Sequence, residues 1–299
     1  MDFLLTFDVE SFSIPLNRSD DETARQVYAQ GLPRVLDLCA KHDIAATFYF
    51  TGEIAEKIPE AVDLVRDHAH EVGCHGYSHE VDRAFDLLEY PEQVSELVKA
   101  KKVIESVAGS IRSFRAPALR INNDTVRALK TTGFVTDSST CPQRFDGPLT
   151  FGSAKKLKWL VMKRTSFFLD PEKSVLEIPV SAMILPFIGT TMRISPFVIN
   201  QLKKNLYFEA YHTGKPVVFL CHPNECLDCT DTISTPRRTS NIIHHIFADR
   251  IRQRLKLRRL GLPAVQLMDE MIRDAQERGF EFHTALGYRN AWGRSHGNI

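Results

Sequence analysis

Seven charged or ionisable side chains, of types that bind metal ions, transfer protons or orient groups that do, follow short apolar runs of the sequence. They are Asp8, Glu10, His75, His79, Arg115, Asp137 and His222. In parallel α/β folds the carboxyl ends of the strands share one face, and that face holds the active site. We therefore expect these separate segments to meet in one pocket.

The segment His75-Gly-Tyr-Ser-His79 places two imidazoles four residues apart. If the segment opens a helix, both rings can reach one ion, and imidazole suits zinc and other first-row divalent metals. The third ligand would be Asp8 or Glu10, which leaves an open position for water, as in catalytic sites. Each piece alone also fits surface histidines or solvated acids, but the combination favours one divalent ion, with zinc as the first choice.

The acids of the first strand can divide two tasks between them. Asp8 and Glu10 lie on the same side of an extended chain, so one can bind the metal while the other takes a proton from water. The residue types alone do not decide which acid does which. His222 is an imidazole, which can take up or release a proton near neutral pH.

Short apolar runs alternate with helical patterns along the chain. This alternation predicts a parallel sheet with helices outside it, either a barrel or an open doubly wound sheet. The strand candidates are Phe3–Phe7, Ala45–Phe50, Glu71–Cys74, Ile111–Phe114, Phe134–Thr136, Val175–Ile178 and Val217–Cys221. The helix candidates are Gly31–Lys41, Pro59–His68, Pro91–Val107 and Asn122–Thr132.

Length and composition predict one soluble globular domain. The chain has 299 residues, with 43% hydrophobic and 25% charged residues and a net charge of +1. α/β barrels of this length are commonly single domains. We expect residues 1–299 to form one catalytic domain. It would contain a basic excursion at about 223–262 and a closing element made of a helix, Pro263–Glu277, and a strand, Phe280–His283.

Five motifs, in order, resemble those of the polysaccharide deacetylase family, whose catalytic region is the NodB homology domain. They stand at Thr6–Glu10, Glu71–His79, Arg115–Pro117, Gly133–Ser138 and Leu220–His222. The resemblance covers the chain from Met1 to about His222. It implies an incomplete or distorted parallel (β/α) barrel that hydrolyses the N-acyl group of an amino sugar with the help of a metal ion.

The resemblance also implies a role for each residue. Asp8 would be the general base and His222 the general acid, while His75 and His79 would bind the metal. Arg115 would orient Asp8, and Asp137 would hold His222 in its protonated form.

The sequence departs from the family pattern at two positions. Val9 replaces the acid that usually follows the base, so we expect Glu10 to be the carboxylate ligand. Ser138 replaces a tryptophan, which predicts a wider or wetter pocket wall.

Two other functions are compatible with the same fold. One is a cyclic-amide or ureide hydrolase that needs no metal, and the other is a degenerate barrel that only binds sugar. The pair His75 and His79 argues against the first, and the retained base and acid argue against the second. The carbohydrate substrate could be a lipid-linked sugar, a soluble saccharide or a polymer precursor.

The start of the sequence shows no basic, apolar secretory pattern, and the spacing of its six cysteines suggests no disulfide framework. We expect a cytoplasmic protein with reduced thiols. Lys155–Arg164 and Arg250–Arg259 are basic and carry apolar residues, so they could bring the protein to the inner face of an anionic membrane, or simply pack. No motif for nucleic acid accompanies this charge, and the sequence does not predict an oligomeric state.

Overall fold

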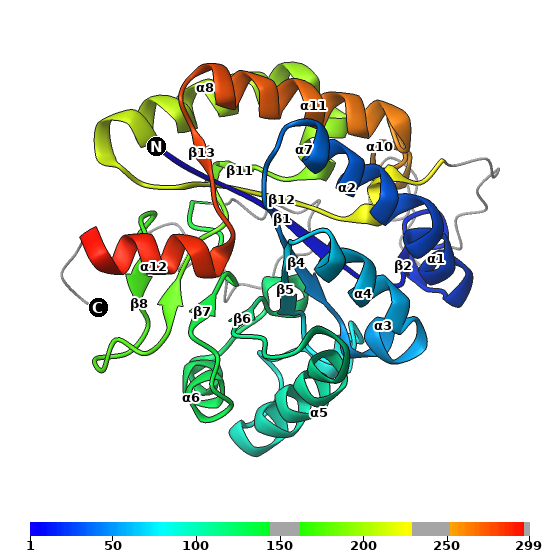
Figure 1. Ribbon diagram of the computed structural model, residues 1–299, viewed down its shortest axis with the longest axis vertical. Helices are drawn as coiled ribbons and strands as arrows, with labels where there is room; N and C mark the ends of the chain where they lie inside the picture. The colour runs from blue at the N-terminus through cyan, green and yellow to red at the C-terminus, as the bar shows by residue number, and fades with distance from the viewer. Residues whose placement is uncertain (144–161, 229–251, 296–299) are drawn as a thin grey trace, which may run out of the picture.

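A curled sheet of mostly parallel strands forms the centre of the computed structural model, which describes residues 1–143, 162–228 and 252–295 (Figure 1). The strands are β1 (Asp2–Val9), β2 (Phe12–Ser13), β3 (Arg18–Ser19), β4 (Thr47–Phe50), β5 (Glu71–Cys74), β6 (Ser113–Phe114), β7 (Thr136–Asp137), β8 (Phe167–Phe168), β9 (Leu176–Glu177), β10 (Ala182–Met183), β11 (Leu185–Pro186), β12 (Val217–Cys221) and β13 (Glu281–Phe282).

The order of the main sheet is β12-β1-β4-β5-β6-β7-β9-β8. Among the described strands of this sheet, only the pair β8–β9 is antiparallel. The short strand β13 pairs in parallel with the start of β1, on the side of β1 opposite to β12. Between β9 and β12, irregular chain replaces regular pairing: the Ser181 amide donates to the Val218 carbonyl, and Ile188 forms a single bridge with Leu220. The barrel is therefore incomplete, which confirms the predicted fold class.

The strand register divides the side chains between two faces. Residues paired across neighbouring strands share a face, and successive residues alternate. Val9, Phe50, Cys74 and Phe114 pair in one row and belong to the large core beneath the helices. Asp8 therefore points to the opposite, inner face, in the same row as Tyr49.

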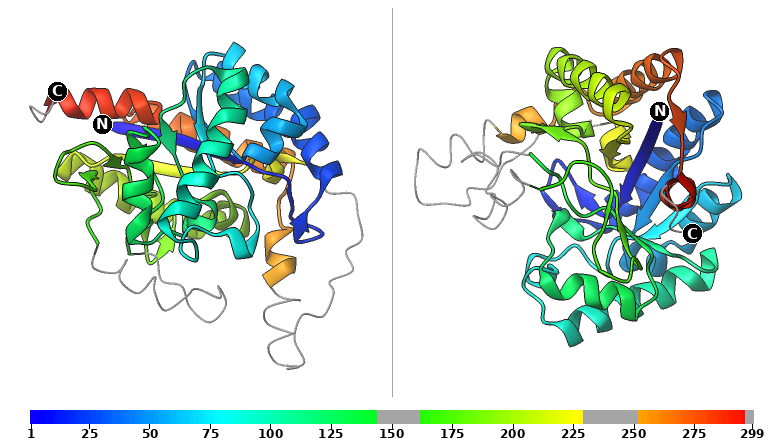
Figure 2. Two further views of the ribbon diagram at one scale, coloured as in Figure 1. Left: turned by 90° about the horizontal axis from the view of Figure 1, so that it is seen from below. Right: turned by 90° about the vertical axis from the view of Figure 1, so that its left-hand side faces the viewer.

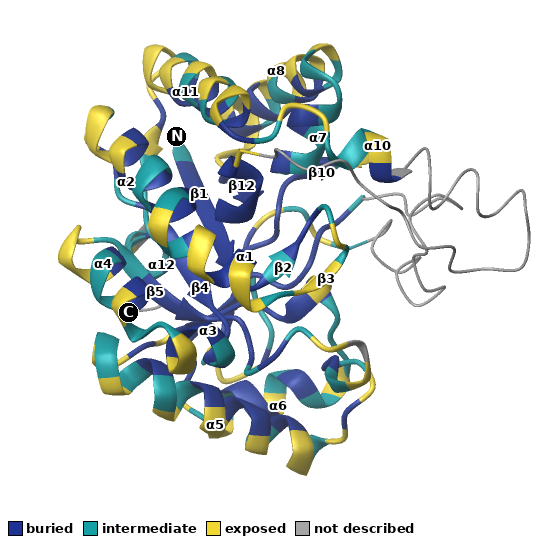
Figure 3. Cartoon of the chain, turned by 90° about the vertical axis from the view of Figure 1, so that its right-hand side faces the viewer, coloured by how far each residue is buried: buried dark blue, intermediate teal, exposed yellow. Residues whose placement is uncertain are grey.

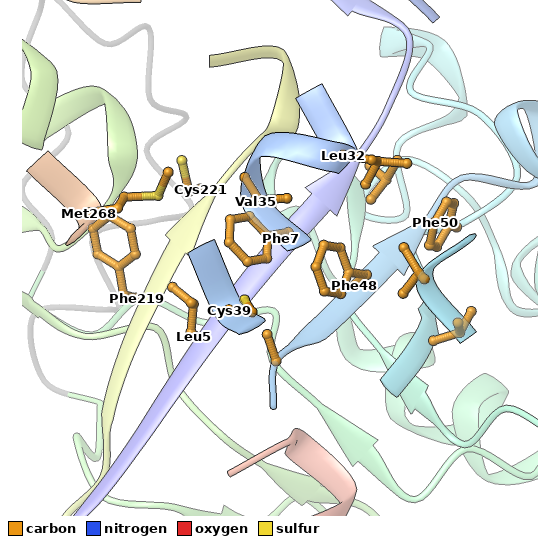
Figure 4. Packing of buried hydrophobic residues seen from close by; sticks show 14 of the residues in the cluster. Leu5, Phe7, Leu32, Val35, Cys39, Phe48, Phe50, Phe219, Cys221 and Met268 are labelled. Carbon is orange, nitrogen blue, oxygen red and sulfur yellow. The ribbon is translucent and has the colours of Figure 1, made fainter. Parts of the chain in front are cut away.

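Apolar side chains from helices and strands fill the outer layer. Figure 4 shows Leu32, Val35 and Cys39 of one helix lying over Phe7 of β1 and Phe48 of β4. Each of these five side chains is almost wholly removed from solvent, so burial of apolar area anchors the helix to the sheet. The burial pattern of Figure 3 agrees, with buried strands inside and exposed outer faces on the helices.

The helices surround the sheet on its outer side, except α12, in which Ala285 and Tyr288 pack against Leu4 on the inner face (Figure 2). They are α1 (Asp21–Gln26), a π-helical turn (Val27–Gly31), α2 (Leu32–Lys41), α3 (Gly52–Lys57), α4 (Pro59–Asp67), α5 (Tyr90–Ala108), α6 (Asn123–Thr131), α7 (Gly189–Ile194), α8 (Pro196–Thr213), α10 (Arg252–Lys256), α11 (Leu262–Glu277) and α12 (Ala285–Ser295). Several begin at clear signals: α4 at Pro59, α5 with a capping box from Glu89 and Glu92, and α6 with an Asn122 cap.

The four helices expected early in the chain all exist, with bounds that shift by a few residues at most, except that the first is preceded by α1 and the π-helical turn. The expected closing helix and strand occur as α11 and β13. The sequence reading missed α3, α7, α8 and the final helix α12. Within the described ranges, none of the helices combines the length and the apolar run needed to cross a bilayer.

Candidate active site

Five of the predicted site residues lie together at the carboxyl ends of β1, β5 and β12. His75 Nε2 is 3.7 Å from Asp8 Oδ2, and His79 Nε2 is 3.2 Å from Glu10 Oε2. His222 Nε2 completes the cluster at 3.8 Å from Glu10 Oε1 and 4.0 Å from Asp8 Oδ2. Parallel pairing places the strand ends side by side, so the topology accounts for the meeting of residues more than 200 positions apart.

Glu10, His75 and His79 have the geometry of a metal site. One ligand atom of each lies within 4.8 Å of the others. Glu10 Oε2 is buried and accepts no hydrogen bond, even though His79 Nε2 is close by. A buried carboxylate oxygen without a partner is costly, and an ion coordinated by all three residues would satisfy it. The residues present thus fit a divalent cation.

A backbone hydrogen bond fixes the ring of His75. Its Nδ1 lies 2.8 Å from the carbonyl oxygen of Arg115, which can only accept, so Nδ1 carries the hydrogen. Nε2 then faces the two carboxylates with its lone pair. Metal-ligating histidines are commonly oriented by such a bond. Burial lowers the pKa of His75, more than Asp8 and Glu10 raise it, and this favours the neutral ring that binds metals.

Arg115, which follows β6, links Asp8 of β1 to the chain that follows β7. Its Nη1 donates to Asp8 Oδ1 at 2.8 Å and to Thr6 Oγ1 at 2.9 Å, and its Nε donates to the Ser138 carbonyl at 3.0 Å. Burial alone would raise the pKa of Asp8, but Arg115, His75 and His222 outweigh it and hold that pKa below its usual value. Asp8 is therefore ionised, with one oxygen held by Arg115 and the other facing the two histidine rings.

Ser138 does not open the pocket wall as the sequence suggested. Its side chain is buried, accepts from Arg115 Nη2 at 2.8 Å and donates to the Ile178 carbonyl at 2.7 Å. The hydroxyl at this position therefore extends the hydrogen-bond network that holds Arg115, and the expectation of a wetter wall is wrong.

The structure does not bring Asp137 to His222. Asp137 pairs with Phe114 and Glu177 in the strand row that faces the helix-covered core, opposite to the face of Asp8. Its Oδ1 accepts from the Ser139 hydroxyl, while Glu177 accepts from the Thr140 amide and hydroxyl. The predicted contact with His222 is thus replaced by a buried carboxyl pair.

Glu225 takes the position beside His222 that the sequence reading gave to Asp137. His222 Nδ1 lies 3.1 Å from Glu225 Oε1, and Glu225 Oε2 accepts from Arg193 Nε at 2.5 Å. Burial disfavours the charged ring of His222, but the hydrogen bond to Glu225 and the charges of Glu10, Glu225 and Asp8 together raise its pKa to about 9. His222 is therefore protonated at neutral pH, with about a quarter of its side chain exposed.

The sequence reading missed Glu225, Arg193 and Thr6. Glu225 follows His222 by three residues, within a short 3-10 turn, Pro223–Cys226. This spacing could have indicated that the carboxylate lies near the His222 ring. Arg193 lies in the unpredicted helix α7, and only the fold brings it to β12. Thr6 was read as part of the first motif but given no role; its hydroxyl donates to the Phe219 carbonyl and accepts from Arg115.

The half-barrel carries, at the carboxyl ends of its strands, a cluster of carboxylates and histidines that could hold a metal ion. Residues 3–136 match the profile of the family described as polysaccharide deacetylase. The match ends just before Asp137, so His222 and Glu225 lie outside it.

Curated relatives and solved structures show similarities of the same kind. The chain is 32% identical over 124 residues to a peptidoglycan deacetylase of Helicobacter pylori, and 33% identical over 85 residues to a peptidoglycan-N-acetylglucosamine deacetylase of Bacillus cereus. These segments are 40% and 28% of this chain, but only 41% and 30% of the two relatives, so the chain spans less than half of either. A crystal structure from Mycobacterium smegmatis, assigned to a polysaccharide deacetylase, shares the fold over 100% of this chain and 91% of its own, with a TM-score of 0.66 and 18% identity.

Proposed function

We propose that this protein is a metal-dependent deacetylase that hydrolyses the N-acyl group of an amino sugar, with the whole chain acting as one catalytic domain. The observation that carries the proposal is that Asp8 and His222 both adjoin the group that can hold a metal: Asp8 Oδ2 lies 3.7 Å from His75 Nε2, and His222 Nε2 lies 3.8 Å from Glu10 Oε1. Amide hydrolysis needs a base for the water and an acid for the leaving amine, and these two residues meet both needs.

The reaction follows from the charges of the site. An ion held by Glu10, His75 and His79 would supply Lewis-acid polarisation of the acyl carbonyl and of water. Asp8 Oδ2, which Arg115 leaves open, takes the proton of the attacking water as the new C–O bond forms. His222 donates its Nε2 proton to the amine nitrogen as the C–N bond breaks, which releases the free amino sugar and a carboxylic acid.

Zinc is the proposed metal, because two imidazoles and one carboxylate are a common catalytic zinc set with one position left for water. The same donor types also bind other first-row metals. The choice does not alter the roles of Asp8 and His222.

We place the protein in the cytoplasm, on the inner side of the membrane, with a lipid-linked or soluble saccharide as its substrate. The five cysteines among the described residues are all free and buried, which suits a reducing compartment. The relatives named for peptidoglycan support an N-acetylated amino sugar as the substrate class.

The test is release of acetate, with formation of free amine, from N-acetylglucosamine oligosaccharides and from peptidoglycan fragments, using protein loaded with zinc. Wild type should release acetate from at least one of them. The matched variant His75→Ala loses a metal ligand and should release none above background. Equal rates for the two proteins would contradict the proposal.

A further inference from the structure

The pairing of His222 with Glu225 has the form of a buried relay. Glu225 is 1% exposed and Arg193 is 1% exposed, and both lie outside the segment that matches the family. Arg193 donates from Nε to Glu225 Oε2, and from Nη1 to the carbonyl oxygens of Lys256 and Arg258 at 2.5 and 2.9 Å. Its guanidinium is thereby held by backbone from another element and cannot turn away from Glu225.

The pocket around Glu225 is shaped for its carboxylate. A Cβ added to Gly189, at the start of α7, would lie 2.6 Å from Glu225 Oε1 and 2.6 Å from Cys221 Sγ. The backbone of α7 therefore approaches the carboxylate as closely as a glycine permits. Burial raises the pKa of Glu225, but Arg193 and His222 outweigh it and lower it to about 2, so the group is a carboxylate.

We infer that Glu225, fixed by Arg193, is the positioning residue that keeps a hydrogen on Nδ1 of His222 and turns Nε2 toward the substrate amine. A carboxylate can only accept, so Nδ1 beside it must donate. Nε2, which faces Asp8 and Glu10, is then the nitrogen that gives up the proton. This role rests on the proposed deacetylase function, and it assigns to Glu225 what the sequence had assigned to Asp137.

The substitution Glu225→Gln tests the inference sharply, because Arg193 dictates how the amide must turn. Arg193 Nε donates and needs an acceptor, so the amide oxygen should face Arg193 and the amide NH2 should face His222. Nδ1 would then have to accept, so the ring would lose its Nδ1 hydrogen and become neutral, with its hydrogen on Nε2. A neutral ring is a much weaker acid than the protonated one, because giving up the Nε2 hydrogen would leave an imidazolate, so proton donation to the amine should slow.

Two readouts are needed. In zinc-loaded protein labelled with nitrogen-15 histidine, with the His222 signals identified by their absence in His222→Gln, wild type should show a hydrogen on Nδ1 and Glu225→Gln should not. On N-acetylglucosamine oligosaccharides, kcat of Glu225→Gln should fall about 100-fold while KM changes less than about threefold, because the substituted residue does not touch substrate. An unchanged Nδ1 signal, or kcat within about threefold of wild type, would overturn the inference.

Two further variants separate positioning from folding. Glu71→Gln changes a partly buried carboxyl that lies at the other end of the barrel, against Thr47 and the start of α12; its kcat should stay within about threefold of wild type. Glu225→Asp keeps the carboxylate and should keep the Nδ1 hydrogen, with kcat at least about tenfold above Glu225→Gln. Equal losses in Asp and Gln variants would show that side-chain length alone matters and would overturn the inference.

The failure of the proposed function would look different. If wild type released no acetate from any substrate tested, the deacetylase proposal would fail. The Nδ1 hydrogen of His222 would still report on Glu225, because it is observed without substrate.

Discussion

Asp8 has one carboxylate oxygen held by Arg115 and one that faces the histidine rings, so its geometry serves proton transfer and its charge is fixed by its neighbours. Asp8→Asn keeps the size and the hydrogen-bonding shape of the side chain but removes the base. We expect kcat to fall by about 10² or more, the usual scale for loss of general acid–base catalysis. Steady-state acetate release measures this, and zinc content measured on the same sample should be close to that of wild type.

His222→Ala removes the proposed acid and leaves the three proposed metal ligands unchanged. We expect a similar loss of about 10² or more in kcat, again with zinc retained. A substrate with a better leaving group than a sugar amine should lose less, because its departure needs less help from a proton. Full activity of either variant would remove that residue from the mechanism.

Six of the seven predicted site residues are found together, because each belongs to a segment that follows a strand marked clearly in the sequence. Asp137 shows the limit of this reasoning. Its strand, β7, has only two residues, too few for an alternating pattern that would tell which face the side chain takes. The observed register puts Asp137 on the core side, and Glu225, which follows β12, lies beside His222 instead.

The carboxyls of Asp137 and Glu177 are a buried pair at the ends of β7 and β9. Burial raises the pKa of Asp137 to about 6, against the opposing effects of Ser139 and Arg115, and raises that of Glu177 well above its usual value, with the Asp137 charge adding to the shift. The folded protein therefore keeps a proton that the unfolded chain has already released above about pH 5. Its stability should consequently fall as pH rises.

Glu177→Gln should weaken this pH dependence, because the amide can still donate to Asp137 and accept from Thr140 but cannot lose a proton. Each pH unit over which the folded state holds one extra proton costs about 1.4 kcal/mol. Between pH 6 and pH 8 we expect the variant to gain about 1–3 kcal/mol of stability relative to wild type, measured by urea unfolding at a series of pH values.

The control for this comparison is Glu172→Gln, an exposed ion-pair partner of Lys130. Its difference in unfolding free energy from wild type should stay nearly constant over the same pH range. A Glu177→Gln difference that is equally flat would show that the pair does not hold a proton.

Two of the helices missed from the sequence, α8 and α12, lack a clear local signal, each for its own reason. α8 buries Ile199, Leu202, Leu206, Tyr207 and Ala210 at helical spacing, but Phe197, Phe208 and Tyr211 on its other face are about 70% exposed, so the apolar period is blurred. α12 begins where its backbone amides meet Thr47 Oγ1 and Glu71 Oε2 at the other end of the barrel. That contact is tertiary, and no local sequence signal reports it.

At the scale of the whole molecule, the fold extends well beyond the segment that matches the family. The match covers residues 3–136, whereas the structural similarity covers 100% of the chain. The second half contributes His222, Glu225 and Arg193, none of which the family match includes. The fragment 1–136 therefore contains the three proposed metal ligands but not His222, the proposed acid.

The membrane hypothesis concerns the surface of the whole protein. Most of Lys155–Arg164, the start of Arg250–Arg259 and the apolar residues at 243, 247 and 251 lie outside the described residues. Of the described part, Arg254 and Arg258 are exposed, while Arg259 donates to the Arg193 carbonyl and packs against α7. The exposed arginines can meet anionic lipid at about 1 kcal/mol each.

Co-sedimentation with anionic and neutral liposomes at low and high salt tests this hypothesis. We expect binding to anionic liposomes at low salt only, and its loss in the variant Arg254→Glu/Arg258→Glu. The matched control Lys102→Glu/Arg127→Glu makes the same change of charge on α5 and α6, on another side of the molecule, and should still bind (Figure 1). Absence of binding at low salt would instead favour a soluble saccharide as the substrate.

The most direct test of the whole account is the position of the metal. In crystals grown with zinc, an anomalous difference map at the zinc edge should show one peak about 2.0–2.2 Å from Nε2 of His75, Nε2 of His79 and a carboxylate oxygen of Glu10, with Asp8 and His222 beside it. No peak at this position, or a peak coordinated by Asp8 in place of Glu10, would contradict the account.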